Sequence, residues 1–213
     1  MKYTETQIKK ISKDLQNKIK GKVLSDPFSR GRYSTDSSLY QITPLGAVLP
    51  KDQNDVLNLM EYSQKNSIPL LARGGGSSQC GQTVNEAIVL DYSMHQNKIL
   101  ELNVEEKYVW VQPGIVLDSL NKYLKPHGLW FPVDVSTSSR ATIGGMTGNN
   151  SCGSRSLYYG NMVNNVLAVE AILDDGSIHT FEDIDKNYLQ ATNDQNRQYE
   201  ICLLYTSPSP RDG

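Results

Sequence analysis

The chain has 213 residues, which is enough for one well-filled domain or two small ones and too few for a large multidomain enzyme. Hydrophobic residues and glycines together make up about 45% of it, a typical globular share that argues against wholesale disorder. The 21 lysines and arginines stand against 23 aspartates and glutamates without a basic block, so the electrostatic footprint of a nucleic-acid-binding protein is absent.

Two further signals bear on location. No apolar stretch is long enough for a membrane span, and the N-terminus lacks the apolar core of a secretory signal. The cysteines Cys80, Cys152 and Cys202 are odd in number and widely spaced, which indicates a reduced compartment and no CxxC metal site. We therefore expect a cytoplasmic protein.

The first third of the chain predicts a small α/β unit. Apolar residues spaced three and four apart in the first twenty residues indicate an amphipathic helix. Residues 25–46 are rich in Ser, Asp, Gly and Pro and read as an irregular connector. A short strand at 47–50, a helix capped by Asp52 and a second strand at 68–72 follow, and the second strand runs into a glycine loop.

From residue 87 onward the pattern is mainly that of strands. A helix with Pro126 and Gly128 just beyond it interrupts them, and Asp174-Asp175-Gly176 is a strong hairpin signal. The expected strands are 87–91, 98–102, 108–112, 166–173 and 177–181, and the expected helix is 116–124.

Glycine is distributed unevenly. Nine of the sixteen glycines fall in two windows, four in 74–81 and five in 144–160. Glycine serves where the backbone takes a positive φ or approaches another group without a Cβ in the way. Two such windows suggest backbone wrapped around a ligand.

The first window, RGGGSSQCG from Arg73, can present consecutive backbone N–H groups and two hydroxyls to an anion such as a pyrophosphate. It is neither a Rossmann fingerprint, because Gln79 stands where the last glycine should be, nor a P-loop, because no Gly-Lys-Ser/Thr follows. A plain tight turn between strands is the alternative.

The second window, over residues 132–153, combines glycines with hydroxyl and amide side chains. Such a stretch suits a flat heterocycle with polar edges, since glycines admit the ring face while polar groups satisfy its carbonyls and nitrogens. A long disordered loop is the alternative, although Ile143, Met146 and Leu157 suit solvent poorly.

These stretches resemble the flavoprotein oxidoreductases whose FAD-binding domain is of the p-cresol methylhydroxylase (PCMH) and vanillyl-alcohol oxidase type. The sequence looks most like the iron–sulfur-linked dehydrogenases of D-2-hydroxy acids, of the D-lactate and glycolate type. The resemblance covers about residues 31–182 and rests on RYSTDSSLYQITPLGAVLP, IPLLARGGGSSQCGQTVNEAIVLDYS, VWVQPGIVLDSLN, LKPHGLWFPVDVSTSSRATIGGMTGNNSCGSRSLYYG and VLAVEAILDDG. It implies an α+β fold: a PCMH-type FAD-binding domain of two α/β subdomains, truncated at its C-terminus.

The resemblance also implies which residues bind FAD. The pyrophosphate loop would comprise Arg73, Gly74, Gly75, Gly76, Ser77 and Ser78. The segment lining the flavin would comprise Pro132, Ser136, Ala141, Thr142, Ile143, Gly144 and Gly145, with Asn149, Ser151, Gly153 and Gly160 close by. It assigns no catalytic residue and no metal ligand within this fragment.

Relatives that hold FAD covalently commonly use a histidine just after the first glycine loop. Ser77, Ser78 and Gln79 stand there, so we expect non-covalent FAD. The family's substrate-binding cap domain, with its histidine-rich motif, and a cysteine-rich [4Fe–4S] region are expected only downstream of this fragment.

The resemblance divides the chain into an N-terminal helical segment at 1–30, an incomplete FAD-binding domain at 31–201 with a subdomain boundary at about 92, and a tail at 202–213. That tail, CLLYTSPSPRDG, looks like translated adaptor sequence, with a genuine disordered terminus as the alternative.

The implied function is the FAD-binding part of a dehydrogenase or oxidase. It would take a hydride from a D-2-hydroxy acid (lactate, glycolate or 2-hydroxyglutarate class) and pass electrons to iron–sulfur centres or another acceptor. The intact parent would be cytoplasmic or peripheral to the inner membrane. Alternatives are a non-catalytic nucleotide-binding or FAD-binding module and a flavin reductase of the cell-wall-precursor type.

Overall fold

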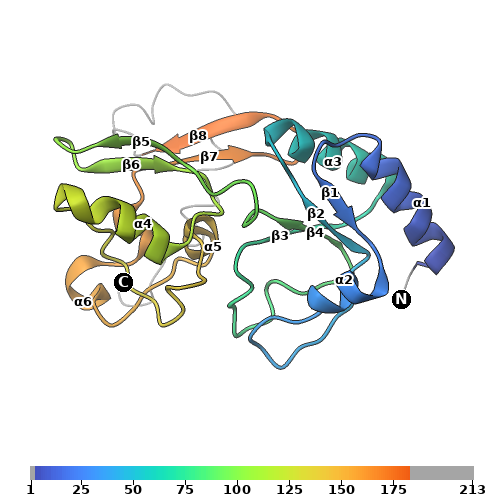
Figure 1. Cartoon of the computed structure of the whole chain (residues 1–213), viewed down its shortest axis with the longest axis horizontal. Coiled ribbons are helices and arrows are strands. Elements are labelled where there is room, and N and C mark those ends of the chain that lie inside the picture. Colours follow the sequence, from blue (N-terminus) through green and yellow to red (C-terminus); the bar gives the residue numbers. More distant parts are fainter. Residues whose placement is uncertain (1–2, 183–213) are drawn as a thin grey trace, which may run out of the picture. The chain divides into compact units, whose positions relative to one another are not determined.

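The computed structural model describes residues 3–182, and the elements named below are labelled in Figure 1. These residues divide into two compact units, of which the first comprises residues 3–166 and 172–179 and the second residues 167–171 and 180–182. The tail predicted at 202–213, together with Cys202, lies outside the described residues.

A four-stranded sheet forms the first part of the larger unit. Its strands are β1 (Lys22–Leu24), β2 (Gly46–Leu49), β3 (Leu70–Arg73) and β4 (Ile88–Asp91), in the order β1-β2-β4-β3. β4 pairs in parallel with both β2 and β3, whereas β1 runs antiparallel to β2. The strands predicted at 47–50 and 68–72 are therefore confirmed. They lie on either side of β4 and do not pair with each other.

Helices cover both faces of this sheet, so every residue of the central strands β2 and β4 is buried. On one face α1 (Glu5–Gln16) and α3 (Gln53–Asn66) share a core with Val48, Ile88 and Leu90. On the other face Tyr33, which ends α2 (Pro27–Arg32), packs with Ala47, Leu49 and Val89.

Of two predictions about the N-terminal region, one is confirmed and the other is wrong in part. Asp52 caps α3 as predicted, because its side chain accepts a hydrogen bond from the backbone N–H of Asp55. The irregular connector predicted at 25–46 is wrong for residues 27–32, which form α2 behind the cap Asp26. The boundary proposed at residue 30 stays a prediction.

The second part of the larger unit is built on an antiparallel pair, β5 (Ile99–Asn103) and β6 (Tyr108–Val111). The remaining helices of this part are α4 (Leu117–Leu124) with a 3-10 turn η1 (Lys125–His127), α5 (Ile143–Gly148), α6 (Ser156–Tyr159) and α7 (Met162–Asn165). Leu117, Leu120 and Leu124 bury one face of α4 in a core that β5 and β6 adjoin. The helix and the strands predicted here are confirmed.

The predicted hairpin is also present. β7 (Ala168–Ile172) and β8 (Ile178–Glu182) form a two-stranded sheet, and Gly176 in the turn has a φ of 83°. Among the helices that the structure describes, none offers the long apolar stretch that crossing a bilayer requires.

One buried carboxylate ties α1, β1 and α3 together. Asp55 is 1% exposed, and its oxygens accept the backbone N–H groups of Lys20 at 2.7 Å, Gly21 at 2.8 Å and Lys51 at 2.8 Å. A buried carboxylate is tolerated when its lone pairs are satisfied in this way. It fixes the turn between α1 and β1 beside the start of α3.

We predict that Asp55→Asn destabilises the chain by about 3 kcal/mol, because an amide loses both the charge and one acceptor oxygen opposite buried N–H groups. The free energy of unfolding in urea, followed by circular dichroism, measures this. Asp52→Asn is the matched control, since Asn also caps helices, and it should cost less than about 1 kcal/mol. Equal losses in the two variants would contradict the role given to Asp55.

Candidate cofactor-binding site

The first glycine loop leaves the carboxyl end of β3 and offers a row of open donors. In the part of the chain that the structure describes, no backbone N–H group from Gly74 to Gln79 has a protein acceptor. Gly76 has a φ of 61°, which turns the backbone between its neighbours. Consecutive N–H groups of this kind form an anion-binding nest, so the loop fits a diphosphate.

Arg73, the last residue of β3, lies beneath this loop and is half-buried. Its guanidinium donates to the carbonyl oxygens of Thr35 at 2.9 Å, Thr83 at 3.1 Å and Tyr33 at 3.4 Å. A Cβ built on Gly76 would lie 2.3 Å from its Nη2 atom, so the loop backbone rests directly on the guanidinium. The side chain therefore holds the loop in place and keeps a positive charge next to the open donors.

A buried carboxylate stands beside Arg73 in the neighbouring strand. Asp91 is the register partner of Arg73 between β4 and β3, and its side chain is 7% exposed. The Tyr33 hydroxyl donates to it at 2.7 Å, and the hydroxyl and N–H of Ser93 donate at 2.6 and 2.8 Å. Burial raises the pKa of the Tyr33 phenol, and the hydrogen bond to Asp91 adds to that rise.

The two glycine windows are in direct contact. A Cβ built on Gly74 would lie 1.9 Å from the Thr142 Oγ1 atom, and one built on Gly75 would lie 2.2 Å from the Arg140 carbonyl oxygen. The hydroxyls of Ser77 and Thr137 are 3.5 Å apart. The structure therefore brings the predicted pyrophosphate loop against residues 137–142 of the predicted flavin segment.

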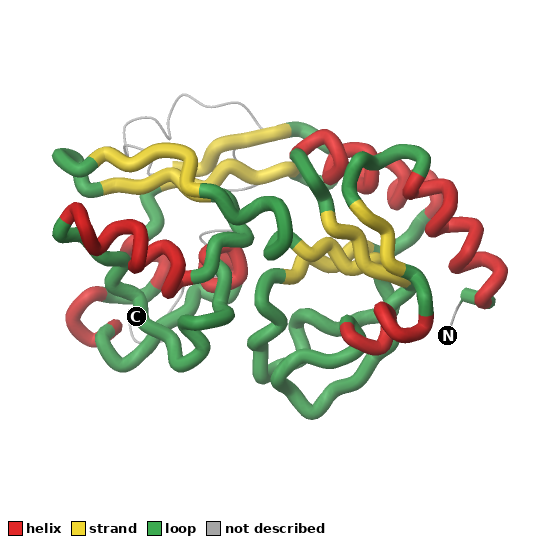
Figure 2. Tube along the Cα trace, viewed as in Figure 1, coloured by secondary structure: helices red, strands yellow, loops and turns green. Residues whose placement is uncertain are grey.

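A second hydrogen bond joins the windows further along. The side-chain amide of Gln82, the residue after the first window, donates to the Asn149 side-chain oxygen at 3.1 Å and so ties this segment to the end of α5. Residues 74–82 form no helix or strand, whereas residues 137–142 lead into α5 (Figure 2).

The second window, unlike the first, uses most of its donors internally. The N–H groups of Ile143 and Gly144 donate to the carbonyls of Ile115 and Pro113, and the N–H of Gly145 donates to the Thr142 hydroxyl. Ala141 and Ile143 are buried in the core under α4. The window is thus an ordered segment and not the disordered loop considered as the alternative.

Internal packing accounts for several glycines that the resemblance assigned to the cofactor. A Cβ on Gly144 would lie 2.5 Å from the Pro113 side chain, and one on Gly153 would lie 1.7 Å from the Asp134 carbonyl oxygen. Gly160 ends α6 with a φ of 79°. These positions need glycine whether or not a ligand is present.

The remaining predicted residues lie on or near the same segment. Pro132 is half-buried, Ser136 is exposed, and Ser151 bonds through its backbone to Met146 and Met162. No hydrogen bond within the described residues joins Ser136, Ser151 or Gly160 to the first glycine loop. Their assignment to FAD stays a prediction.

Sequence reasoning missed Tyr33, Asp91 and Thr137. Asp91 carried a usable signal, since a carboxylate directly after an apolar strand lies at the sheet edge where α/β proteins bind ligands. Tyr33 carried none, because it lies 40 positions before Arg73 in a stretch that we expected to be irregular.

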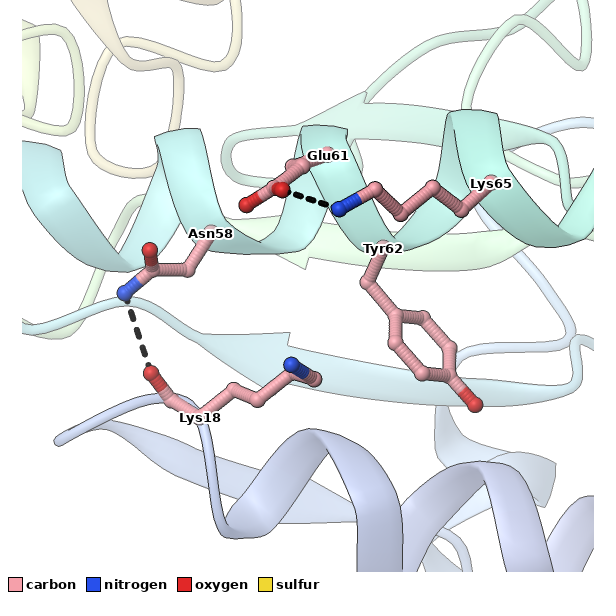
Figure 3. Close-up of a pocket in the computed structure, with 5 residues that line it drawn as sticks. All are labelled: Lys18, Asn58, Glu61, Tyr62 and Lys65. Carbon is pink, nitrogen blue, oxygen red and sulfur yellow. Dashed lines mark hydrogen bonds and ion pairs between the residues drawn. The ribbon is translucent and has the colours of Figure 1, made fainter.

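A separate pocket of about 130 Å³ lies between the end of α1 and α3 (Figure 3). Glu61 and Lys65 form an ion pair on its rim, and the Asn58 amide donates to the Lys18 carbonyl at 3.0 Å. Drug-sized ligands occupy pockets of roughly 300–1,000 Å³. This pocket is too small for a dinucleotide, and it contains none of the predicted site residues.

We predict that Gly75→Ala lowers the melting temperature by roughly 5 °C, because its Cβ meets a backbone carbonyl and the two windows must move apart. Thermal unfolding followed by circular dichroism measures the shift. Gly148→Ala is the matched control, since a Cβ there meets no atom within 4 Å, and it should leave the melting temperature unchanged or higher. An unchanged melting temperature in Gly75→Ala would mean that the windows are not in contact.

The chain is similar in sequence to known proteins over most of its length. The D-2-hydroxyglutarate dehydrogenase of Haemophilus influenzae is 44% identical over 172 residues, which are 78% of this chain and 16% of that protein. The glycolate oxidase subunit GlcD of Bacillus subtilis is 31% identical over 176 residues, which are 79% of this chain and 37% of that protein. The chain therefore spans well under half the length of these relatives.

Solved structures show the same fold. An alkyldihydroxyacetonephosphate synthase superposes with a TM-score of 0.71 at 21% identity, over 85% of this chain and 40% of that one. The family described as FAD binding domain matches residues 44–182, a range that holds both glycine windows. With that match over most of its length, the chain belongs to the FAD-binding domain family of PCMH type.

Proposed function

We propose that this chain is the FAD-binding part of a dehydrogenase that oxidises a D-2-hydroxy acid. The observation that carries the FAD site is the row of open N–H groups from Gly74 to Gln79 above the Arg73 guanidinium. The substrate class rests on the likeness to a D-2-hydroxyglutarate dehydrogenase and a glycolate oxidase subunit.

The first glycine loop binds the diphosphate of FAD in this proposal. Its backbone donors point at fixed positions before the ligand arrives, so they need little reorganisation to meet phosphate oxygens. The Ser77 hydroxyl accepts from Thr137 and keeps its own proton as a further donor, whereas the Ser78 hydroxyl donates to the Gln82 side chain. Arg73 contributes positive charge from below. We assign Arg73, Gly74, Gly75, Gly76, Ser77 and Ser78 to this role.

The second window lines the flavin in this proposal. Because its N–H groups are bonded internally, it contributes shape and side chains more than open backbone donors. Gly145 is exposed and has only the Thr142 hydroxyl near the place of its missing Cβ, so a ring can approach the backbone there. We assign Pro132, Ser136, residues 141–145, Asn149, Ser151, Gly153 and Gly160 to this surface.

FAD, when bound, supplies an acceptor for the hydride that leaves the hydroxyl-bearing carbon of the substrate. We assign the base that takes the hydroxyl proton, the groups that hold the substrate, and any iron–sulfur centre that accepts electrons to parts of the parent protein beyond this chain. The matched parts are only 16% and 37% of the two curated relatives, which leaves length for these parts.

We predict that the 213-residue chain, refolded with FAD and desalted, shows the two visible absorption bands of oxidised flavin. The flavin is held without a covalent bond, because Ser77, Ser78 and Gln79 stand where a histidine would attach it. Precipitation with acid should therefore leave a colourless pellet and put all the flavin in the supernatant. Absorption spectra of the two fractions measure this.

A yellow pellet would contradict non-covalent binding. A chain that stays folded by circular dichroism, remains colourless after FAD and still binds ADP in calorimetry would favour a nucleotide-binding module without redox chemistry. Loss of the visible flavin bands when a reduced nicotinamide cofactor is added, in the absence of any hydroxy acid, would favour the flavin reductase.

A further inference from the structure

Arg73 and Asp91 are placed as an ion pair would be, yet they do not form one. They are register partners at the ends of the parallel strands β3 and β4, so their backbones lie about 4.8 Å apart and their side chains leave the same face. Opposite charges in such positions usually attract each other. Among the described residues, however, no carboxylate lies within ion-pairing distance of the Arg73 guanidinium.

Tyr33 stands between the two groups. Its ring lies under the guanidinium, with 5.4 Å from the Arg73 Cζ atom to the ring centroid, while its hydroxyl donates to Asp91 at 2.7 Å. Tyr33 is 8% exposed, so the packing against Ala47, Leu49 and Val89 fixes its ring. The Tyr33 side chain thus contacts the Arg73 guanidinium with its ring face and binds the Asp91 carboxylate with its hydroxyl.

Other donors also bind the two carboxylates near Arg73. Ser93 gives Asp91 two further hydrogen bonds, one from its hydroxyl and one from its backbone N–H. Asp36, the second carboxylate whose charge acts on Arg73, is itself held by the N–H of Ser38 at 2.8 Å and the hydroxyl of Thr83 at 3.1 Å. Both nearby carboxylates are therefore satisfied by groups other than Arg73.

The guanidinium itself is bonded only to neutral groups. Three backbone carbonyls accept from it, and carbonyls fix its position without cancelling its charge. Burial lowers the pKa of the Arg73 guanidinium, but an arginine remains charged at neutral pH. A positive charge that is ion-paired with neither neighbouring carboxylate therefore lies directly beneath the open N–H groups of the glycine loop.

We propose that Tyr33 is a positioning residue that keeps Asp91 from pairing with Arg73 and so preserves the Arg73 charge for a diphosphate bound on the glycine loop. This inference rests on the proposed function for its ligand, but the separation of the two charges is a property of the chain alone. The two parts can therefore be tested apart.

The first test needs no ligand. Arg73→Gln, Asp91→Asn and the double variant form a thermodynamic cycle whose coupling is read from the unfolding equilibrium in urea. With Tyr33 present we expect a coupling of less than about threefold in the unfolding constant, and with Tyr33→Phe more than about tenfold, because Asp91 is then free to reach Arg73. Strong coupling with Tyr33 present, or weak coupling in both backgrounds, would overturn the inference.

The second test measures FAD affinity by quenching of flavin fluorescence. Tyr33→Phe keeps the ring under Arg73 and should raise the dissociation constant about tenfold, with a weaker dependence on salt. Adding Asp91→Asn to Tyr33→Phe should restore the affinity to within about threefold, because an amide cannot neutralise Arg73. A purely structural role for Tyr33 predicts no such rescue and an unchanged salt dependence.

Two controls complete the experiment. Tyr62→Phe removes another tyrosine–aspartate hydrogen bond, from Tyr62 to Asp14 on α1, and should leave FAD affinity unchanged. Riboflavin lacks the diphosphate, so its affinity should be the same with and without Tyr33→Phe. If the wild-type chain bound no FAD, the proposed function would fail while the cycle between Arg73 and Asp91 would still decide the inference.

Discussion

The close approach of residues 74–75 to residues 140–142 is the contact on which the rest of the site depends. The places that Cβ atoms would take at Gly74 and Gly75 are already filled by Thr142 and by the Arg140 carbonyl. Larger residues would separate the windows, and the loop after β3 would lose its support on that side. The glycines therefore serve the protein's own packing first, and that packing leaves the N–H edge of the loop open to a ligand.

Most elements of the fold could be predicted because their signals are local. The apolar runs at 88–91 and 108–111 and the cap at Asp52 each depend on a few adjacent residues. The position of β4 between β2 and β3 could not be predicted, because strand pairing depends on contacts between distant segments. The short helix α2 was missed although Asp26 and Pro27 mark its start, since Ser, Gly and Arg beyond them carry no helical periodicity.

The candidate site was predictable in part for the same reason. The glycine windows stand out in the sequence, but whether a glycine faces a ligand or a neighbouring backbone depends on the fold. Gly144 against Pro113 and Gly153 against Asp134 show this, since both are packing positions. The link from Tyr33 to Asp91 spans 58 positions and involves two residue types that are common in cores and at strand ends, so no local pattern reveals it.

The two windows also differ in where their hydrogen-bonding capacity goes, and this difference follows from the elements that flank them. The first leaves β3 as a free loop and keeps its N–H groups open, whereas the second runs into α5 and gives its donors to the Pro113–Ile115 backbone and to the Thr142 cap. Open backbone donors suit a charged group that needs several hydrogen bonds at once, and an internally bonded segment suits the flat face of a ring. On the proposed function, the diphosphate is thus recognised by charge and donors at the sheet edge, while the ring is recognised by the shape of a rigid segment.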